Sequence, residues 1–393
     1  MKSRVILIPC DSYEKAALDA AVREGFRLWG GIETLASADE PVLFKANLLK
    51  RSKPEQAVIT HPALMESIAE YFREKGYEHL SYGDSPGTES LKKVAADTGM
   101  AKAMERQQVN CGDFDHGIRV DHPQGHLAKS FVLAKEVAKR PAVINVCKMK
   151  THALERMTGA VKNMYGCISG FNKAAGHTIY SDADSFARML IDLNQCIRPR
   201  FCIMDGIVAM EGNGPGSGTP VDMKVILMSD DFVALDSVCC HLMHVDPSLV
   251  PTNVHGEQMG YGTWHSENIR VVTPEGEITP EEAGEKYGKP DFDVYRGRQV
   301  RPFWRRLNQA MGILRRRPYI DEDRCIHCGI CVDACPVEGK AVRFPEGGRG
   351  KAAPVYDYKK CIACFCCQEM CPRQAVQVHT PWLRKMMDRL GGR

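Results

Sequence analysis

Two stretches near the end of the chain share one spacing of cysteines: CIHCGICVDACP at residues 325–336 and CIACFCCQEMCP at residues 361–372. Both follow the pattern C-x2-C-x2-C-x3-C-P. Three thiolates on one tight loop can reach three corners of a metal–sulfur cube, whereas the fourth corner must be met from elsewhere in the chain. The proline after each fourth cysteine helps the chain to turn away from the loop. The pattern therefore predicts a small domain folded around metal.

The repeated pattern assigns eight cysteines to two [4Fe-4S] clusters whose ligands cross between the halves. One cluster is expected on Cys325, Cys328, Cys331 and Cys371, and the other on Cys361, Cys364, Cys367 and Cys335. Paired C-x2-C units also build structural zinc sites, which makes zinc the alternative metal. Cys366 breaks the spacing. It is interpreted either as a thiol that hydrogen-bonds to cluster sulfur or as a small space-filling residue.

The sequence around the cysteines repeats as well. Asp321 precedes Cys325 by the same 4 residues that separate Asp357 from Cys361. We therefore expect two similar hairpin-and-loop units, related by a pseudo-twofold axis, in a small α+β two-cluster ferredoxin-like domain over residues 319–379. Two clusters with crossed ligands lie close together. That arrangement suits electron transfer better than a purely structural role.

Length, charge and cysteine usage narrow the class of protein. A chain of 393 residues with 44% hydrophobic content is expected to form at least two globular domains. The net charge is only +3, so nucleic acid is not an expected partner, and contact with a membrane is not expected either. The first residues turn polar too early for a secretory signal. Seventeen cysteines fit a reducing compartment, and these features together predict a cytoplasmic protein of an anaerobic cell.

Residues 1 to about 245 alternate between strand-like and helix-like segments, which predicts an α/β domain with a mostly parallel sheet, and this domain is expected to extend over residues 1–298. The expected strands are Val5–Ile8, Val42–Lys45, Ala57–Thr60, His79–Gly83, Ala142–Cys147, Phe201–Met204 and Lys224–Met228. The expected helices are Tyr13–Leu28, Ala63–Lys75, Leu127–Ala138, Ser185–Ile197 and Phe232–His244. The polar stretch Ile269–Arg298 lacks strong periodicity and is expected to be an appendage where the chain leaves this domain.

Two basic segments flank the cysteine-rich domain. Residues 299–318 include a run with six arginines from Arg301 to Arg317, and they are interpreted as a linker or docking helix. The tail at 380–393 also has apolar residues at helical spacing. A basic amphipathic helix can rest on a membrane surface or a partner. The same apolar stripe could instead cap the small domain, and that interpretation is favoured.

One group of polar residues lies at 146–170. Lys148, Lys150 and His152 follow the end of an expected strand, which is where ligands bind in open parallel sheets. Lys162 and Asn163 come roughly three helical turns later. Together these groups could hold a carboxylate or a phosphate. The alternative is that the lysines are solvated and His152 caps a helix.

A second polar group lies at 204–220, where Asp205 and Glu211 accompany five glycines. Such a loop lets backbone amides approach a ligand closely. The alternative is a flexible surface loop.

Several short motifs of the large domain are specific in combination. They are Lys45 and Asn47, Gly83–Gly87, Lys148 with Lys150–His152, Gly159 with Lys162 and Asn163, Asp205–Gly206, Glu211–Gly212 with Gly214–Gly216, and Ala234–Asp236. By these motifs, residues 5–245 resemble the domain-of-unknown-function 362 family (DUF362), often joined to a ferredoxin module. The resemblance implies an architecture and candidate pocket residues. It implies no reaction and no substrate.

These observations predict an iron–sulfur oxidoreductase, or a reductase component, that delivers electrons to an anionic small molecule bound in the large domain. The expected catalytic residues are His152, Lys150, Asp205 and Glu211, with His152 as a proton donor. The expected substrate-binding residues are Lys45, Asn47, Asp84, Lys148, Lys162 and Asn163. No flavin or nicotinamide fingerprint is visible, so a redox partner protein or direct transfer is required.

Two other functions are compatible with the same residues. In one, the protein is a ferredoxin-like carrier whose large domain docks a partner redox enzyme. In the other, the large domain is an isomerase or lyase, and the clusters of the cysteine-rich domain are structural.

Overall fold

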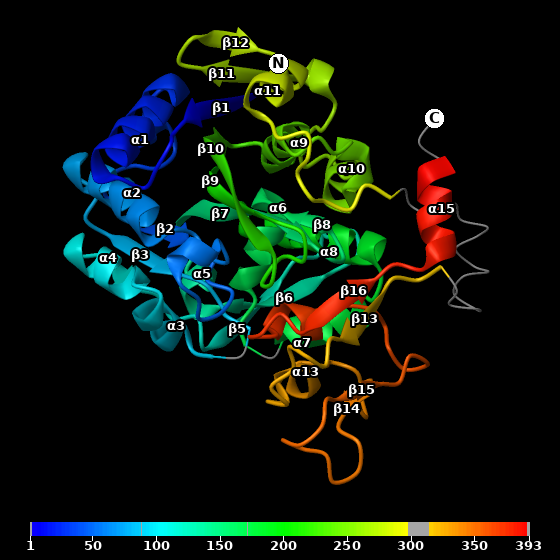
Figure 1. The fold of residues 1–393 in the computed structure, drawn as a ribbon. Helices are drawn as coiled ribbons and strands as arrows, with labels where there is room; N and C mark the ends of the chain where they lie inside the picture. Colours follow the sequence, from blue (N-terminus) through cyan, green and yellow to red (C-terminus); the bar gives the residue numbers. More distant parts are fainter. Residues whose placement is uncertain (1, 88, 171, 298–313, 391–393) are drawn as a thin grey trace.

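One large mixed sheet runs through the first 290 residues of the computed structural model, which describes residues 2–87, 89–170, 172–297 and 314–390 (Figure 1). The strand order is β12-β11-β1-β10-β9-β7-β2-β3-β4, with β8 paired to β7. The strands are β1 (Ser3–Pro9), β2 (Val42–Lys45), β3 (Leu80–Gly83), β4 (Asn110–Cys111), β7 (Ala142–His152), β8 (Arg156–Thr158), β9 (Phe201–Glu211), β10 (Thr219–Ser229), β11 (Ile269–Thr273) and β12 (Gly276–Ile278).

The sheet is parallel from β4 to β9, while β10 runs antiparallel to both β9 and β1. The central strand β7 is buried along its whole length. A strand covered on both faces is expected to read as a continuous apolar run, as Ala142–Cys147 does. The predicted α/β class with a mostly parallel sheet is therefore confirmed.

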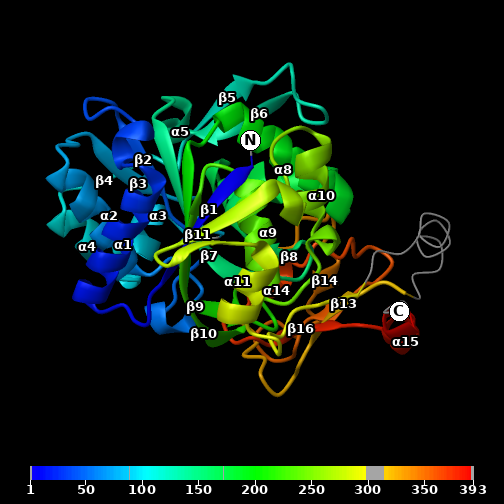
Figure 2. The same ribbon diagram turned by 90° about the horizontal axis from the view of Figure 1, so that it is seen from above.

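Helices cover both faces of the sheet, and Figure 2 shows the two groups on opposite sides of the strands. One group consists of α1 (Lys15–Trp29), α2 (Pro62–Glu74), α3 (Leu91–Asp97) and α4 (Met100–Arg106). The other contains α8 (Ala183–Ile197), α9 (Phe232–Leu242) and α10 (Pro251–Gln258). Phe72 lies edge-on to both Phe26 and Phe44, with ring centroids 5.8 and 5.1 Å apart, and so ties α2 to α1 and to β2. Each such buried side chain stabilises the fold by roughly 1.5–3 kcal/mol.

Two expected elements are wrong. Residues 57–60 are not a strand but a buried segment before α2, where side chains replace a strand neighbour: the hydroxyl of Thr60 donates to the carbonyl of Val146 at 2.7 Å. The expected helix Leu127–Ala138 is mostly strand. Its residues 130–134 form β6 (Ser130–Ala134), which pairs with β5 (Gly117–Asp121), and only α5 (Lys135–Ala138) is helical. Tertiary pairing overrides local propensity there.

The stretch after residue 269 belongs to the sheet rather than to an appendage. Strand β11 pairs in parallel with β1, and β12 pairs with β11. Helix α11 (Pro280–Tyr287) follows, with a capping box at Thr279 and Glu282. The two strands are only five and three residues long, so a periodic pattern has too few positions to stand out in the sequence.

The small domain begins and ends on one pair of strands. Strand β13 (Arg317–Ile320) enters it and pairs antiparallel with β16 (Val376–His379), by which the chain leaves. Between them lie α13 (Ile330–Asp333), β14 (Val342–Arg343), β15 (Val355–Tyr356) and α14 (Cys366–Met370), and α15 (Trp382–Leu390) follows β16. The predicted linker helix at 299–318 falls largely outside the described residues. No helix in the described ranges is both long enough and apolar enough to cross a bilayer.

Candidate functional site: a cavity between the two domains

The two crossed sets of cysteines surround two separate small voids. One void is lined by Cys325, Cys328, Cys331 and Cys371, and the other by Cys335, Cys361, Cys364 and Cys367. Each void thus has one cysteine from the opposite motif. Cys366 lines neither void.

The surroundings of the thiols suit a cluster. Backbone N–H groups donate to sulfur at Cys335 and Cys371, over 3.3 and 3.2 Å, and the Tyr356 hydroxyl donates to Cys367 at 3.2 Å. Such donors stabilise negative charge on cluster ligands. Within the described residues, no three His, Cys, Asp or Glu side chains gather as ligands of one metal ion. A cubane instead spreads four thiolates over four irons, so the cysteine sets fit it.

The second cysteine loop is docked on the glycine-rich loop of the large domain. The side-chain amide of Gln368 donates to the carbonyls of Asn213 and Gly214, over 2.7 and 3.1 Å. A Cβ atom on Gly216 would lie 2.4 Å from the carbonyl oxygen of Glu369, so only glycine permits this approach. Lys50 donates to the carbonyls of Glu369 and Cys371, over 3.1 and 2.9 Å. The glycine-rich loop therefore receives the small domain.

His152 and Glu369 join the two domains through their side chains. The backbone N–H groups of Leu154 and Glu155 donate to Nδ1 of His152, each over 3.1 Å, so the ring proton is placed on Nε2. Nε2 then donates to the Glu369 carboxylate at 2.8 Å. Burial, together with the charge of Lys162, lowers the pKa of His152 to about 4, so the imidazole is neutral at physiological pH.

Beside this contact lies a cavity of about 850 Å³ between the domains. The large domain contributes polar groups that include Asn47, Asp84, Lys150, Lys162, Asn163, Tyr165, Lys173 and His177. The small domain contributes Cys335, Lys340, Cys366, Glu369 and Met370 among others. The volume suits a small-molecule ligand. One cysteine of the second void, Cys335, is also a wall of this cavity.

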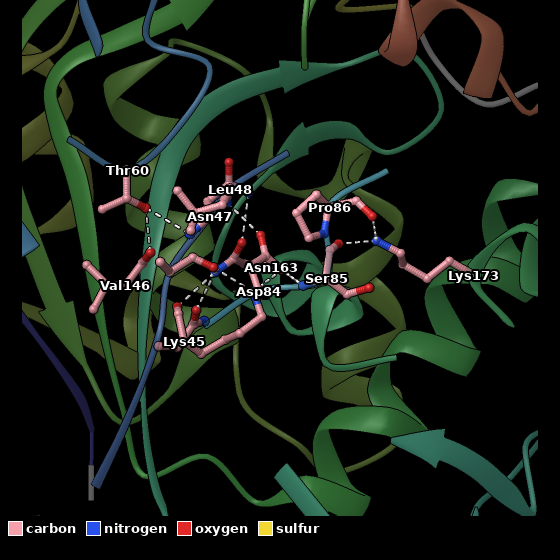
Figure 3. Close-up of polar contacts among 12 residues, drawn as sticks. Lys45, Asn47, Leu48, Thr60, Asp84, Ser85, Pro86, Val146, Asn163 and Lys173 are labelled. Carbon is pink, nitrogen blue, oxygen red and sulfur yellow. Dashed lines mark hydrogen bonds and ion pairs between the residues drawn. The ribbon is translucent and has the colours of Figure 1, made fainter. Parts of the chain in front are cut away.

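Three lysines of the large domain, Lys150, Lys162 and Lys173, line the cavity, whose wall also includes the acidic residues Asp84, Glu89, Asp115, Asp333 and Glu369. Lys150 donates to Asn47 at 2.8 Å and to the carbonyl of Val58 at 2.7 Å, and burial, then Lys162, lowers its pKa to about 7. Lys173, on α7 (Asn172–Ile179), donates to the carbonyls of Ser85 and Pro86, and burial lowers its pKa to about 8 (Figure 3). Lys162 lies on α6 (Ala160–Asn163) and lines the cavity, and its ammonium has no hydrogen bond or ion pair among the described residues.

Hydrogen-bonded asparagine side chains support the lysine wall, which is the part of the cavity wall that carries Lys150, Lys162 and Lys173. Asn47 donates to Asn163 at 2.8 Å, and Asn163 donates in turn to Asn145 at 2.6 Å. Lys45 does not line the cavity but forms an ion pair of 2.9 Å with Asp84, whose carboxylate also accepts from the backbone of Leu48 (Figure 3). Asp84 is thus already neutralised, and it shapes the wall without adding free negative charge.

His177 stands at the same wall with an unused nitrogen. Its ring stacks on Phe186, with centroids 4.5 Å apart, and meets the edge of Tyr165 at 5.5 Å. Nδ1 is buried and has no hydrogen-bond partner in the part of the chain that the structure describes. Burial lowers the pKa of His177 to about 3, so the ring is neutral and available to a ligand.

Besides Lys45, three of the expected site residues lie away from the cavity: Lys148, Asp205 and Glu211. Lys148 is fully buried and forms an ion pair of 2.9 Å with Asp205, its neighbour across strands β7 and β9. Both groups also hydrogen-bond to the hydroxyl of Tyr13, over 2.8 and 2.7 Å, so this network is satisfied within itself. Glu211, at the end of β9, accepts from the backbone of Asp293 at 3.0 Å. His152 is adjacent to the cavity but turned toward Glu369.

The sequence analysis did not identify four residues that the structure places at the site: Lys50, Lys173, His177 and Glu369. Lys173 and His177 are one helical turn apart, a spacing that places both on one face of a helix. Glu369 lies between two cluster cysteines. The C-x2-C-x2-C-x3-C-P pattern identifies only the cysteines on either side of Glu369 and gives no role to the residue between them.

Comparison with known proteins follows the same division of the chain. Residues 42–241 match the family described as domain of unknown function DUF362, and residues 317–372 match a 4Fe-4S dicluster domain. The chain is 34% identical over 263 residues to the thylakoid-associated protein sll1697 of Synechocystis sp., which covers 66% of this chain and 80% of that protein.

Among solved structures, the chain is similar to the lactate racemase apoprotein from Thermoanaerobacterium thermosaccharolyticum, with a TM-score of 0.39 and 14% identity. That similarity covers 61% of this chain and 56% of the racemase chain, so the chain spans little more than half of that structure's length. The sequence motifs, the family match over residues 42–241 and the cysteine-rich match that follows it agree. The chain belongs to the DUF362 family and is an iron–sulfur protein of that family, with a 4Fe-4S dicluster domain that follows the family domain in sequence.

Proposed function

We propose that this protein is an iron–sulfur oxidoreductase that reduces an anionic small molecule in the cavity between its two domains. The observation that carries the proposal is the composition of the cavity wall. Lys150, Lys162 and Lys173 line one side, while Cys335 and Glu369 of the cysteine-rich domain line the other. A ligand in this cavity would contact both the cationic groups and the loop of the second set of cysteines.

Two [4Fe-4S] clusters held by the crossed cysteine sets would supply one-electron transfer to such a ligand. The remaining work belongs to side chains of the large domain. Lys162 offers an ammonium that has no hydrogen bond or ion pair within the described ranges, which makes it the first anchor for a carboxylate or phosphate. Lys150, held between Asn47 and Val58, adds a second positive group whose charge an anion would stabilise.

A reduction also needs protons at the ligand. His177 presents at the cavity wall a nitrogen that has no hydrogen-bond partner among the residues that the structure describes, and Lys150 has a pKa of about 7. An arriving anion would raise the pKa of both groups, because opposite charge favours their protonated forms. We therefore assign proton delivery to His177 and Lys150. His152 instead positions Glu369, and Lys148 and Asp205 stabilise the fold.

Electrons are proposed to come from a partner redox protein that contacts the first set of cysteines. Cys328 is exposed, and its neighbour Ile326 is 53% exposed, whereas Cys335 and Cys367 are buried. The first set of cysteines is therefore the accessible one. We place the protein in the cytoplasm, whose reducing conditions protect free thiols.

The proposal is tested with full-length protein whose clusters are reconstituted anaerobically. The dithionite-reduced protein is titrated with inorganic phosphate and examined by electron paramagnetic resonance. We expect phosphate to shift only the signal of the cluster bound by Cys335, since that cysteine lines the cavity. Fumarate then serves as a reducible anion, and it should reoxidise the protein faster than a neutral ester of the same acid.

The matched variants are Lys162→Gln and Lys102→Gln. Lys102 is an exposed lysine on α4, far from the cavity, so its replacement should change nothing. Lys162→Gln should weaken phosphate binding by about tenfold or more, since it removes a charged hydrogen-bond donor. Equal phosphate binding by both variants, with neither cluster signal shifted, would refute the proposed site.

A further inference from the structure

Helix α15 lies at the edge of the molecule, beyond the two-stranded stem of the small domain, which is the pair of strands β13 and β16 (Figures 1 and 2). One face of this helix is anchored to the large domain. Arg384 pairs with Asp388 along the helix at 3.0 Å, and the Tyr295 hydroxyl donates to the same carboxylate at 2.7 Å. The guanidinium of Arg316 lies over the Tyr295 ring, 4.1 Å from its centroid. These contacts fix which side of α15 is turned inward.

The opposite face is apolar and basic. Trp382 is 74% exposed, Met386 is 43% exposed, and Lys385 is exposed between them. Positions 382, 385 and 386 share one face of a helix, because residues three and four apart are neighbours on its surface. Trp382 and Met386 are thus turned away from the protein, whereas Leu383 and Met387 of the same helix are half-buried.

The tail that carries the helix is basic, since residues 380–393 contain Arg384, Lys385, Arg389 and Arg393 against one acidic residue, Asp388. Arg156, Arg316 and Arg384 are close enough to influence one another electrostatically, and Asp388 is the acidic group that they share. Asp388 already pairs with Arg384 on the inner face, while Lys385 remains on the outer face. A surface that approaches α15 therefore meets net positive charge together with exposed apolar side chains.

We propose that α15 rests on the anionic surface of a lipid bilayer, with Trp382 and Met386 entering the headgroup region and Lys385 facing lipid phosphates. A protruding tryptophan on a short helix needs a matching pocket on a protein partner. A fluid bilayer accommodates it without one, and tryptophan favours the boundary between headgroups and acyl chains. Few residues take part, so the contact is reversible and sensitive to salt. It does not depend on the function of the cavity.

The test is sedimentation of the full-length, cluster-loaded protein with vesicles. Vesicles of phosphatidylcholine mixed with phosphatidylglycerol should carry the protein down at low salt and release it at high salt. Vesicles of phosphatidylcholine alone should bind it weakly. Trp382→Ala and Lys385→Glu should each weaken binding to the anionic vesicles by about tenfold or more.

The matched controls are Ile179→Gln, which removes a side chain that is 70% exposed on α7, and Lys102→Glu, which reverses an exposed charge on α4. Both should bind like the parent protein. The proposal is overturned if anionic vesicles do not carry the protein down, or if Trp382→Ala and Lys385→Glu bind as the controls do. It is also overturned if light scattering shows a dimer that Trp382→Ala converts to a monomer, because a second copy would then cover this face.

Discussion

Nε2 of His152 donates to the carboxylate of Glu369 at 2.8 Å across the junction of the two domains, although the two residues lie 217 positions apart in sequence. His152 ends the central strand of the large sheet, whereas Glu369 stands in the second cysteine loop. The same carboxylate feels the charge of Lys162, which with His152 holds the pKa of Glu369 below its ordinary value even though burial opposes this. One hydrogen bond therefore links the cysteine loop to the lysine wall of the cavity.

Glu369→Ala is expected to loosen this junction. It leaves the buried N–H of His152 without an acceptor, which costs about 2 kcal/mol of unfolding free energy. Glu369→Gln keeps an acceptor oxygen at nearly the same place and should retain most of that stability. Denaturant unfolding of the cluster-loaded protein measures both variants. Equal stability of Glu369→Ala and the parent would show that the contact does not hold the domains together.

Lys148 and Lys162 should respond to substitution in opposite ways, although the sequence suggests one role for both. Lys148→Met leaves Asp205 buried without its cation and is expected to cost about 3 kcal/mol of stability. Lys162→Met removes a group without a described partner and should change stability by no more than about 0.5 kcal/mol. Phosphate binding should show the reverse order when the folded fraction of each variant is compared. A stable Lys148→Met variant would contradict the structural role given to that lysine.

Serine substitutions distinguish the crossed ligands from Cys366. Cys371→Ser lies in the second motif, but it should disturb the cluster whose other ligands are Cys325, Cys328 and Cys331. Cys335→Ser should disturb the other cluster. Cys366→Ser lies outside both voids and should retain the full iron content, about eight irons per chain for two cubanes. Iron and sulfide analysis, with spectra of the reduced variants, checks these outcomes, and a loss of iron in Cys366→Ser would count against the assignment.

The stability of the large domain should fall on acidification because of His61. This imidazole stacks on the Tyr13 ring with centroids 3.6 Å apart, and burial lowers its pKa to about 4. Between about pH 6.5 and pH 4 this imidazole binds a proton in the unfolded chain but not in the folded protein. The free energy of unfolding therefore decreases as pH falls through this range. The loss is on the order of 2 kcal/mol, allowing for the partial solvent contact of His61.

The control for this pH dependence is His61→Asn. The asparagine oxygen can still accept from the backbone of Ala63 at the start of α2, as Nδ1 of His61 does at 3.2 Å, but it does not titrate. The unfolding free energy of the variant should therefore vary less between pH 6.5 and pH 4. An unchanged pH profile would assign the acid sensitivity to other groups, such as His152 and His177.

The sequence revealed most where the chemistry is local. Three cysteines of each motif lie on one loop and can reach one cluster, while the fourth reaches the other cluster. The two crossed sets could therefore be inferred from the spacing of the cysteines in the sequence. Asp205 and Lys148 show the opposite case. They meet because β7 and β9 are adjacent in the sheet, and that register is set by the fold rather than by residues near either side chain.

The cavity could be predicted only in part for the same reason. Lys150, Lys162 and Asn163 were expected at a ligand because they follow one strand, and all three line the cavity. Glu369 and His177 come from other segments: His177 lies on α7 of the large domain, and Glu369 reaches the cavity only after the small domain packs on the large one. Local patterns also misassigned residues 127–138. Their apolar residues suit either a helix or a half-buried strand, and pairing with β5 decides between them.

The pairing of β13 with β16 has a consequence for how such a chain can change over evolutionary time. Because the cysteine-rich module starts and finishes on the same two-stranded stem, it can be gained, lost or exchanged as a cassette at one point of the gene, without breaking any strand of the large sheet. The scaffold would survive such an exchange. The cavity would not, because one of its walls would leave with the cassette.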